Sequence, residues 1–334
     1  MASFKILKTI ETHTGGQPTR IVIGGLPDFS GQSVSEKRMC AKKNYDSIRK
    51  FLCFEPRGHA AMYSAYLVES NLADLGVIFC SQVGYDDMCG HGIIGVVTAI
   101  IEEGVMPFKD QISVETPSGV VSAKVCKRAE KVHSVSFRCV TSFTYKKDLS
   151  INVPGFGTLC GDIAFGGNWY FYVNADSLGI KISSENIVKF LKLGSAIKEV
   201  WNDNNTLMHP VNSNVSQNLL GVSFFSTATR NETVISQKNL VVESSSFFDR
   251  SPCGTGTAGR MAILNARGHL PVGASFENIS ITGSRFTGTV LLNVKQGPFI
   301  GVVSMLTGSA TVIGSAEWNF DQEDYFGFID LNLE

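Results

Sequence analysis

The chain has 334 residues, of which 43% are hydrophobic and 18% charged, and its formal net charge is −1. This composition is typical of a globular protein and excludes a disordered, collagenous or coiled-coil chain. The nearly balanced charge does not attract a polyanion, so we expect no nucleic-acid partner. The longest apolar run, Ile93 to Ile101, is too short for a membrane span, and the N-terminal segment lacks a signal-peptide pattern. The sequence therefore predicts a soluble, cytoplasmic protein without a membrane partner.

Helix and strand signals in the first half of the chain alternate. Ser33 and Glu36 form a capping-box pattern that predicts a helix running towards Leu52. A second helical pattern follows Cys89 and ends at Gly104, where glycine suits a helix C-terminus. The predicted strands are 112–114 and 120–125, joined by a turn at 116–119, and 132–140.

The second half of the chain also contains both helix and strand signals. We expect a linker near 145–154, where charged and turn residues gather, and then a helix over 184–201. Its apolar face holds Ile187, Phe190, Leu191 and Ile197. The predicted strands are 170–173, 222–225, 234–242, 290–294 and 310–313, and another helix runs from Cys253 to Gly268. One long helix per half among many strands predicts α+β domains with mixed sheets and not a doubly wound sheet.

One short motif occurs twice. Residues 89–95 read CGHGIIG and residues 253–259 read CGTGTAG, so both fit C-G-x-G-x-x-G. The two copies lie about half a chain apart, and each opens a predicted helix. A single glycine-rich segment of this kind is weak evidence, but a repeated one led by cysteine indicates two similar halves.

The chain has eight cysteines. It contains no C-x-x-C pair and no Cys/His spacing typical of a zinc finger, so we expect no structural metal site. A chain of this length can bury a core without disulfide bonds. Most of the cysteines are therefore expected to be free, buried and inert.

Cys89 and Cys253 differ from the other cysteines because each stands at the start of a helix. Unpaired N–H groups and the helix dipole stabilise a thiolate there, and the same N–H groups can hold a carboxylate. If both cysteines met one bound amino acid, a thiolate could remove the Cα proton while a thiol returned a proton to the opposite face. Such a pair would invert the stereochemistry without a cofactor.

The sequence around these residues resembles the proline racemase superfamily. The resemblance lies in MCGHG around Cys89, in DRSPCGTGT at 249–257, and in the segments 55–59, 115–119 and 161–168. The superfamily includes proline racemases, 4-hydroxyproline 2-epimerases and trans-3-hydroxy-L-proline dehydratases. The sequence looks most like a 4-hydroxyproline 2-epimerase.

The resemblance implies a fold of the diaminopimelate epimerase type. It has two similar α/β domains, each with a mixed sheet around a central helix, and an active site in the cleft between them. The N-terminal domain would comprise 1–148 plus 321–334 and carry Cys89, while the C-terminal domain would comprise 152–320 and carry Cys253. The resemblance also implies an imino-acid substrate, no cofactor, no metal and a potential homodimer.

The resemblance assigns roles to further residues. Cys89 and Cys253 would be the acid/base pair. Backbone N–H groups would hold the substrate carboxylate, and two side chains would contact the ring amine. The N–H groups are those of Gly90, His91, Gly254 and Thr255, and the side chains are those of Asp249 and His91.

Three positions bear on the choice of substrate. Family dehydratases usually carry Thr at the second cysteine position, so Cys253 favours racemase or epimerase chemistry. Proline racemases carry Phe at two ring-facing positions that hold Tyr63 and Glu243 here. A buried carboxylate without a partner is costly, so these polar residues favour a hydroxylated ring. We therefore expect cofactor-independent epimerisation at Cα, from trans-4-hydroxy-L-proline to cis-4-hydroxy-D-proline.

Four alternatives stay open at this point. Within the family they are proline racemase and trans-3-hydroxy-L-proline dehydratase. Outside it they are an amino-acid-binding protein on a duplicated scaffold and a redox sensor that forms a Cys89–Cys253 disulfide.

Overall fold

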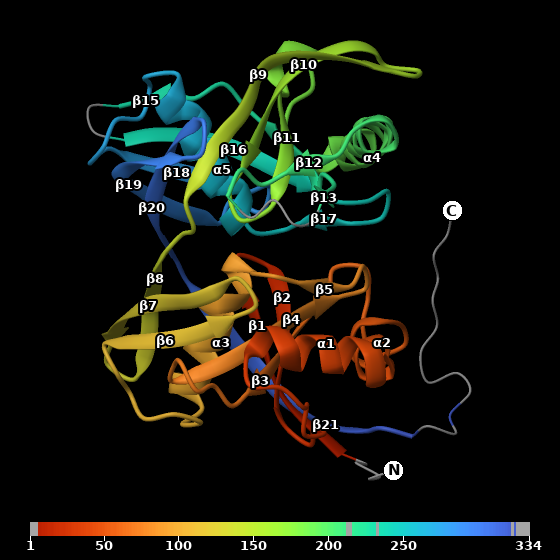
Figure 1. Ribbon diagram of the computed structural model, residues 1–334, viewed down its shortest axis with the longest axis vertical. Helices are drawn as coiled ribbons and strands as arrows, with labels where there is room; N and C mark the ends of the chain where they lie inside the picture. The colour runs from red at the N-terminus through yellow and green to blue at the C-terminus, as the bar shows by residue number, and fades with distance from the viewer. Residues whose placement is uncertain (1–5, 212–215, 232–233, 322–323, 325–334) are drawn as a thin grey trace. The chain divides into compact units, whose positions relative to one another are not determined.

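A computed structural model describes residues 6–211, 216–231, 234–321 and 324 of the chain (Figure 1). The chain divides into two compact units. The first contains residues Met1–Phe137 and Gly308–Glu334, and the second contains Arg138–Thr307. Among the described residues, no helix combines the length and apolar character needed to cross a membrane.

The first unit is built on a mixed sheet. Its strands are ordered β21-β1-β2-β3-β4-β6-β7-β8, with parallel pairing between β2 and β3 and between β4 and β6. The strands are β1 (Ile6–Thr14), β2 (Gln17–Gly24), β3 (Tyr63–Val68), β4 (Leu75–Ser81), β5 (Tyr85–Asp86), β6 (Gln111–Thr116), β7 (Gly119–Arg128), β8 (Lys131–Arg138) and β21 (Ala310–Asn319). Every residue of β4 is buried because helices cover both faces of the sheet at this strand.

Helix α3 (Gly90–Glu102) is the central helix of the first unit and contacts β1, β2, β3, β7 and β21 (Figure 1). It is uniformly apolar and buried up to Ile101, which explains its lack of a polar face. The opposite face of the sheet carries α1 (Val34–Asn44) and α2 (Asp46–Cys53). The predicted capping box of Ser33 and Glu36 is present, but the predicted helix breaks at Tyr45 into these two helices.

The second unit repeats this arrangement. Its strands are ordered β9-β10-β11-β14-β16-β18-β19-β20, with parallel pairing between β11 and β14 and between β16 and β18, and β20 also pairs with β9. The strands of this sheet, with β17, are β9 (Ser142–Val153), β10 (Gly157–Phe165), β11 (Trp169–Asn174), β14 (Gly221–Phe225), β16 (Val234–Val242), β17 (Phe248–Asp249), β18 (Ser275–Ile279), β19 (Arg285–Gln296) and β20 (Phe299–Gly308). Shorter elements are β12 (Leu207–Met208), β13 (Ser216–Gln217), β15 (Thr229–Arg230) and the 3-10 helices η1 (Asp176–Leu178) and η2 (Ser184–Asn186).

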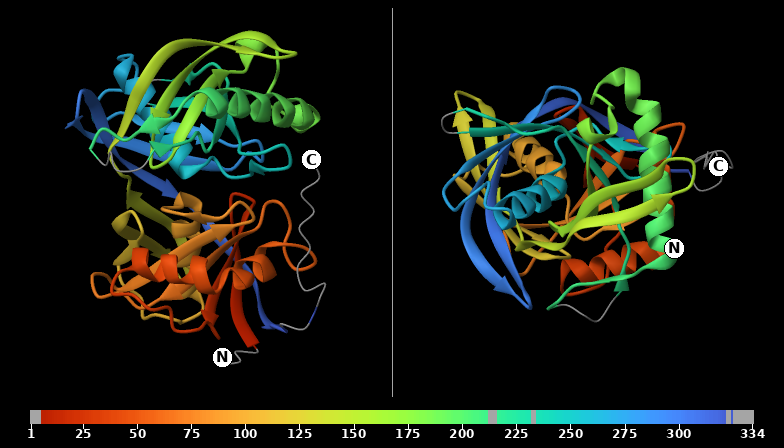
Figure 2. Two further views of the ribbon diagram at one scale, coloured as in Figure 1. Left: turned by 45° about the vertical axis from the view of Figure 1, so that its right-hand side comes forward. Right: turned by 90° about the horizontal axis from the view of Figure 1, so that it is seen from above.

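Helix α5 (Gly254–Ala266) is the central helix of the second unit and contacts β9, β10, β11 and β19. Helix α4 (Ile187–Asn204) covers the other face of the sheet (Figure 2) and buries Phe190, Leu193 and Ile197. Gly194 has a packing reason, because a Cβ atom there would lie 2.7 Å from Val242 Cγ1. The helix therefore needs glycine for close approach, although glycine lowers helix propensity.

The two units match element by element. In each, two strands lead to helices on one face of the sheet, and two antiparallel strands then lead to a short strand and the central helix. Residue Phe79 of β4 lies opposite Asp86 of β5, and Val241 of β16 lies opposite Asp249 of β17. The duplication predicted from the repeated motif is thus visible in the strand pairing, and the predicted α+β class with mixed sheets is confirmed.

The unit boundaries differ from the predicted ones, which placed a linker near 145–154 and a return of the chain at 321–334. The segment expected as a linker lies mostly within β9, a strand that pairs with β10 throughout its length. The chain returns to the first unit earlier, because β21 pairs with β1 from Ile6 to Thr14. Most of the segment 321–334 lies outside the described residues.

Candidate functional site

Cys89 lies directly before α3 at the end of the sheet where β5 stops. It is the N-cap residue, with φ −137° and ψ 110°, and its side chain is buried. The first intrahelical hydrogen bond goes from the Ile93 N–H to the Cys89 carbonyl at 2.9 Å, so the preceding N–H groups cannot be satisfied within the helix. This helix start therefore offers donors to an anionic group.

The thiol of Cys89 contacts the ring of His91, which packs on Tyr63. Its Sγ lies 3.4 Å from Nδ1 and 3.6 Å from Nε2 of His91. The His91 ring packs edge-on against the Tyr63 ring with centroids 4.8 Å apart, and both residues are buried. The Thr14 hydroxyl donates to the His91 carbonyl at 2.9 Å, which ties the first turn of α3 to β1.

Tyr63 connects this cluster to Asp86. The Tyr63 hydroxyl forms a hydrogen bond with the Asp86 carboxyl group. Burial, together with the neighbouring Asp87 carboxylate, raises the pKa of Asp86 to about 7, although Tyr63 and Arg38 act in the opposite direction. Asp86 was not among the residues expected at the site.

Cys253 occupies the corresponding N-cap position of α5, but its backbone and partners differ. Its φ is +61°, a value that residues with a side chain adopt only at a cost. Its Sγ accepts a hydrogen bond from the Gly256 N–H at 3.3 Å and lies 3.6 Å from the Tyr170 hydroxyl and 3.8 Å from the Thr255 hydroxyl. The two hydroxyl groups are 2.8 Å apart.

Two carboxylates influence Cys253. Burial raises the pKa of its thiol well above the usual range, and Asp249 and Glu243 raise it further, while the hydrogen bonds from Gly256 and Tyr170 lower it. Asp249 is buried, and its Oδ1 accepts the Ser251 N–H at 2.8 Å. Glu243 is also buried, and the Lys198 ammonium donates to its backbone carbonyl at 2.7 Å. These charges favour the neutral thiol at Cys253.

The glycines of the repeated motif have packing roles. A Cβ atom at position 92 would lie 3.1 Å from Cys89 Sγ and 2.5 Å from Phe79 Cε1, and one at position 256 would lie 3.0 Å from Cys253 Sγ. Glycine here gives each thiol its space. The third glycine of each copy allows the helix to approach its sheet closely, at Thr12 for Gly95 and at Tyr172 for Gly259.

The predicted site residues form two clusters, one in each unit. The first comprises Cys89, Gly90, His91 and Tyr63, and the second comprises Cys253, Gly254, Thr255, Asp249 and Glu243. Asp86 and Tyr170 belong to these clusters and were missed. Asp86 could have been found, since it precedes Cys89 by three residues much as Asp249 precedes Cys253 by four. Tyr170 has no local signal, because only the strand pairing brings it to Cys253.

The remaining cysteines are free, as expected. Cys53, Cys80 and Cys139 are buried, Cys40 is half-buried, and Cys126 and Cys160 are exposed. Within the described part of the chain, no three or more His, Cys, Asp or Glu side chains are grouped so that they could hold a metal ion.

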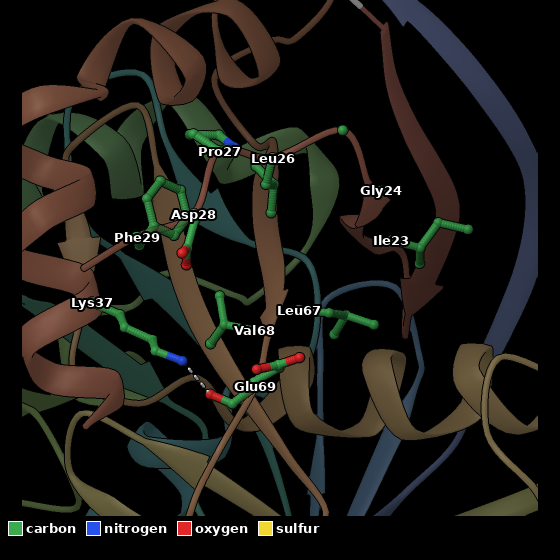
Figure 3. Close-up of a pocket in the computed structure, with 11 residues that line it drawn as sticks. Ile23, Gly24, Leu26, Pro27, Asp28, Phe29, Lys37, Leu67, Val68 and Glu69 are labelled. Carbon is green, nitrogen blue, oxygen red and sulfur yellow. Dashed lines mark hydrogen bonds between the residues drawn. The ribbon is translucent and has the colours of Figure 1, made fainter. Parts of the chain in front are cut away.

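A pocket of about 410 Å³ lies elsewhere in the first unit (Figure 3). Leu67, Val68 and Glu69, at the C-terminal end of β3, line this pocket, whereas Tyr63 is the first residue of that strand. The Lys37 ammonium reaches across it and donates to the Glu69 carbonyl at 2.7 Å. None of the residues that line the pocket is a cysteine, and it lies away from the repeated motif, so we place the candidate site residues at the two helix starts.

Comparison with known proteins shows the family of the chain. The family model described as proline racemase matches residues 9–328. The chain is 36% identical to a proline racemase of Clostridioides difficile over 323 residues, which cover 95% of this chain and 96% of the relative. It is 38% identical to a trans-3-hydroxy-L-proline dehydratase of Burkholderia ambifaria over 331 residues, which cover 97% of this chain and 98% of the relative.

A solved structure supports the fold. The hydroxyproline epimerase from Agrobacterium vitis, determined with bound trans-4-hydroxy-L-proline, superposes with a TM-score of 0.88 at 26% identity and covers 99% of this chain and 98% of its own. The proteins that resemble this chain thus include a racemase, a dehydratase and an epimerase. Because the family model matches nearly the whole length, the chain belongs to the proline racemase family, whose racemases and epimerases are amino-acid isomerases.

Proposed function

We propose that the protein is a cofactor-independent epimerase that interconverts trans-4-hydroxy-L-proline and cis-4-hydroxy-D-proline. The observation that carries the proposal is the repeated buried cysteine at the start of a central helix, once in each unit. A pair of acid/base groups of one kind suits a reaction that removes a proton from one face of a carbon and returns one to the other.

The helix starts would hold the substrate carboxylate. The N–H groups of Gly90, His91, Gly254 and Thr255 precede those of Ile93 and Thr257, which donate to the N-cap carbonyls of α3 and α5. The helix dipoles add to the attraction for an anion. Asp249, buried near Cys253, would attract the cationic ring amine, and His91 would contact the same amine.

The two thiols would exchange one proton each per turnover. In one direction the thiolate of Cys89 accepts the Cα proton, and the thiol of Cys253 gives its proton to the opposite face. In the other direction the roles reverse. Cys253 suits the donor role in the free enzyme, because burial and the carboxylates Asp249 and Glu243 favour its neutral form. A bound ring amine would weaken that effect by neutralising the carboxylates.

Polar groups next to both thiols favour a hydroxylated ring over proline. Tyr63 and Asp86 lie in the Cys89 cluster. In the other cluster, Glu243 raises the pKa of Cys253, and the Tyr170 hydroxyl lies 3.6 Å from its Sγ. Among them, Asp86 has a buried oxygen, Oδ2, that needs a hydrogen-bond donor when a ligand excludes water. A hydroxyl group on the ring supplies one, whereas proline does not.

The test is proton NMR of the reduced protein in D₂O with trans-4-hydroxy-L-proline, L-proline and trans-3-hydroxy-L-proline in separate tubes. We expect loss of the Cα–H signal and appearance of the cis-D epimer chiefly in the first tube. Faster exchange with L-proline would replace the proposal by a proline racemase. Consumption of the 3-hydroxylated substrate alone, with a ketimine product trapped by a carbonyl reagent, would replace it by a dehydratase.

The homodimer and the cytoplasmic location stay predictions of the sequence. Light scattering of the purified protein tests the dimer, and a fluorescent fusion of the full chain tests the location.

A further inference from the structure

Asp86 stands where Asp249 stands in the other unit. Each is the last residue of a two-residue strand that leads into a central helix, and each pairs with the equivalent strand of its sheet, Asp86 with Phe79 and Asp249 with Val241. Phe79 and Val241 themselves lie against the equivalent glycines Gly92 and Gly256. The duplication therefore places one carboxyl group before each thiol.

The Asp86 side chain lies on the face of the sheet that carries α3. Directly opposed residues of antiparallel strands share a face, and Phe79, opposite Asp86, packs on Gly92 of α3. Tyr63, which hydrogen-bonds to Asp86, packs on His91, and the His91 ring contacts Cys89 Sγ. A continuous series of contacts thus runs from Asp86 to the thiol.

One oxygen of Asp86 lacks a partner. Its Oδ2 is buried and accepts no hydrogen bond from the described residues. A buried acceptor without a donor is unfavourable, so such atoms mark places where a ligand or water completes the bonding. The groups that act on this carboxyl are Asp87 beside it, Tyr63 from β3 and Arg38 from α1, while Cys89 and His91 lie beyond Tyr63 on α3.

We propose that Asp86, together with the Tyr63 hydroxyl, forms a polar subsite beside Cys89 that binds the ring hydroxyl of a hydroxylated imino acid and so determines specificity against proline. This inference rests on the proposed function for its substrate class. The hydroxyl donates to Asp86 Oδ2, and the Tyr63 hydroxyl keeps the carboxyl group oriented. A neutral hydroxyl suits this subsite because the ring cation is already matched by Asp249 in the other cluster.

The experiment compares kcat and KM of the full-length protein, its Asp86→Ala and Asp86→Asn variants and the control Asp87→Asn. Substrates are trans-4-hydroxy-L-proline, trans-3-hydroxy-L-proline and L-proline. Asp87→Asn controls for the loss of a nearby charge, because the half-exposed Asp87 side chain pairs with Arg38 at the surface and acts on Asp86 through its charge. We expect Asp86→Ala to lower kcat/KM for one hydroxylated substrate by about 10- to 100-fold, mainly through KM, and to leave L-proline within about threefold. Asp86→Asn, whose amide oxygen still accepts, should recover part of the loss.

A second readout does not depend on turnover. Each imino acid is titrated as a protectant of Cys89 against iodoacetamide, with the labelled peptide measured by mass spectrometry. Protection by a hydroxylated imino acid that weakens only in Asp86→Ala supports the subsite even if the NMR assay shows no epimerisation. An equal loss for proline and hydroxyproline, or a wild-type preference for proline, would overturn the subsite and leave Asp86 a structural residue.

Discussion

Cys89 and Cys253 occupy the same place in two copies of one fold, yet their surroundings differ. Cys89 has an extended backbone and a thiol against the imidazole of His91, whereas Cys253 has φ +61° and a thiol that accepts the Gly256 N–H. The residue two positions after each cysteine, His91 or Thr255, accounts for much of the contrast. The duplication thus preserves where a thiol stands and lets its hydrogen-bond partners diverge.

The charges around the thiols differ as well. Asp249 and Glu243 both raise the pKa of Cys253. The position in the first unit that corresponds to Asp249 holds Asp86, whose own pKa is raised to about 7 by burial and by Asp87. The second thiol therefore has two carboxyl groups that raise its pKa, whereas the carboxyl group in the Cys89 cluster is partly protonated near neutral pH. Such asymmetry suits a pair in which one member starts as the donor.

The largest expected effect comes from removing either thiol. Cys89→Ser and Cys253→Ser should each lower the rate of epimerisation by about 10²- to 10⁴-fold, because an alcohol is a far weaker acid and base than a thiol at neutral pH. Polarimetry with trans-4-hydroxy-L-proline measures the loss. Cys126→Ser and Cys160→Ser are matched controls at exposed positions and should retain full activity. Wild-type rates in either helix-start variant would contradict the two-base scheme.

A smaller effect should follow from filling the space beside each thiol. In Gly92→Ala the new methyl group would lie 3.1 Å from Cys89 Sγ, and in Gly256→Ala it would lie 3.0 Å from Cys253 Sγ. We expect each change to destabilise the fold by about 1–3 kcal/mol, measured by urea unfolding. The control Gly314→Ala meets no atom within 4 Å. The comparison predicts similar losses in both units, and a loss confined to one unit would count against their equivalence.

Neutralising Glu243 should change the reactivity of one thiol and not the other. The carboxylate raises the pKa of Cys253, so Glu243→Gln should lower that pKa and increase the thiolate fraction. Each unit by which the pKa of Cys253 falls would raise the rate of its alkylation by iodoacetamide at pH 8 up to about tenfold. A small decrease in the nucleophilicity of the thiolate would offset part of this gain. Mass spectrometry of the Cys253 and Cys89 peptides separates the two sites. Glu199→Gln, at an exposed position of α4, is the control, and unchanged labelling of Cys253 would refute the prediction.

A further effect concerns the pH dependence of stability. The pKa of Asp86 is raised from 3.8 in a free side chain to about 7 in the folded protein, so the folded state binds this proton more tightly. Its contribution to the free energy of unfolding is therefore present below about pH 4 and is lost as the pH rises to about 7. Asp86→Asn lacks this loss, so its Tm relative to wild type should increase between pH 4 and 7. Asp87→Asn should show a weaker trend of the same sign, because Asp87 helps to raise the pKa of Asp86. A Tm difference between Asp86→Asn and wild type that does not vary with pH would exclude this role.

The repeated motif was sufficient to predict the central helices and both cysteines, because local glycine spacing and helix caps reflect short-range geometry. The segment 145–154 was misjudged for a physical reason. Lys146, Lys147 and Asp148 are exposed, and their charges resemble those of a linker, although they lie on one strand of a hairpin formed with β10. The break at Tyr45 likewise depends on packing, since α2 directs Ile48, Phe51 and Leu52 into the core that lies against the sheet.

The site residues that could be predicted lie near a cysteine in sequence or, like Tyr63, were assigned by the family resemblance. Asp249 and His91 fall within the motifs, but Tyr170 reaches Cys253 through the pairing of β11 with β14 and of β14 with β16. No sequence pattern encodes that register directly. Asp86 lies between these cases, since its position before Cys89 was visible but its role becomes apparent only when β5 is compared with β17.

The pairing of β1 with β21 has a consequence for synthesis of the protein. The first described strand, Ile6–Thr14, forms hydrogen bonds with the last described one, Ala310–Asn319. While the ribosome is still translating the second unit, β1 has only β2 beside it and presents an open edge that other chains can join. The second unit, by contrast, is continuous in sequence and can fold as soon as it emerges. The half of the molecule that is translated first is thus the half that is completed last.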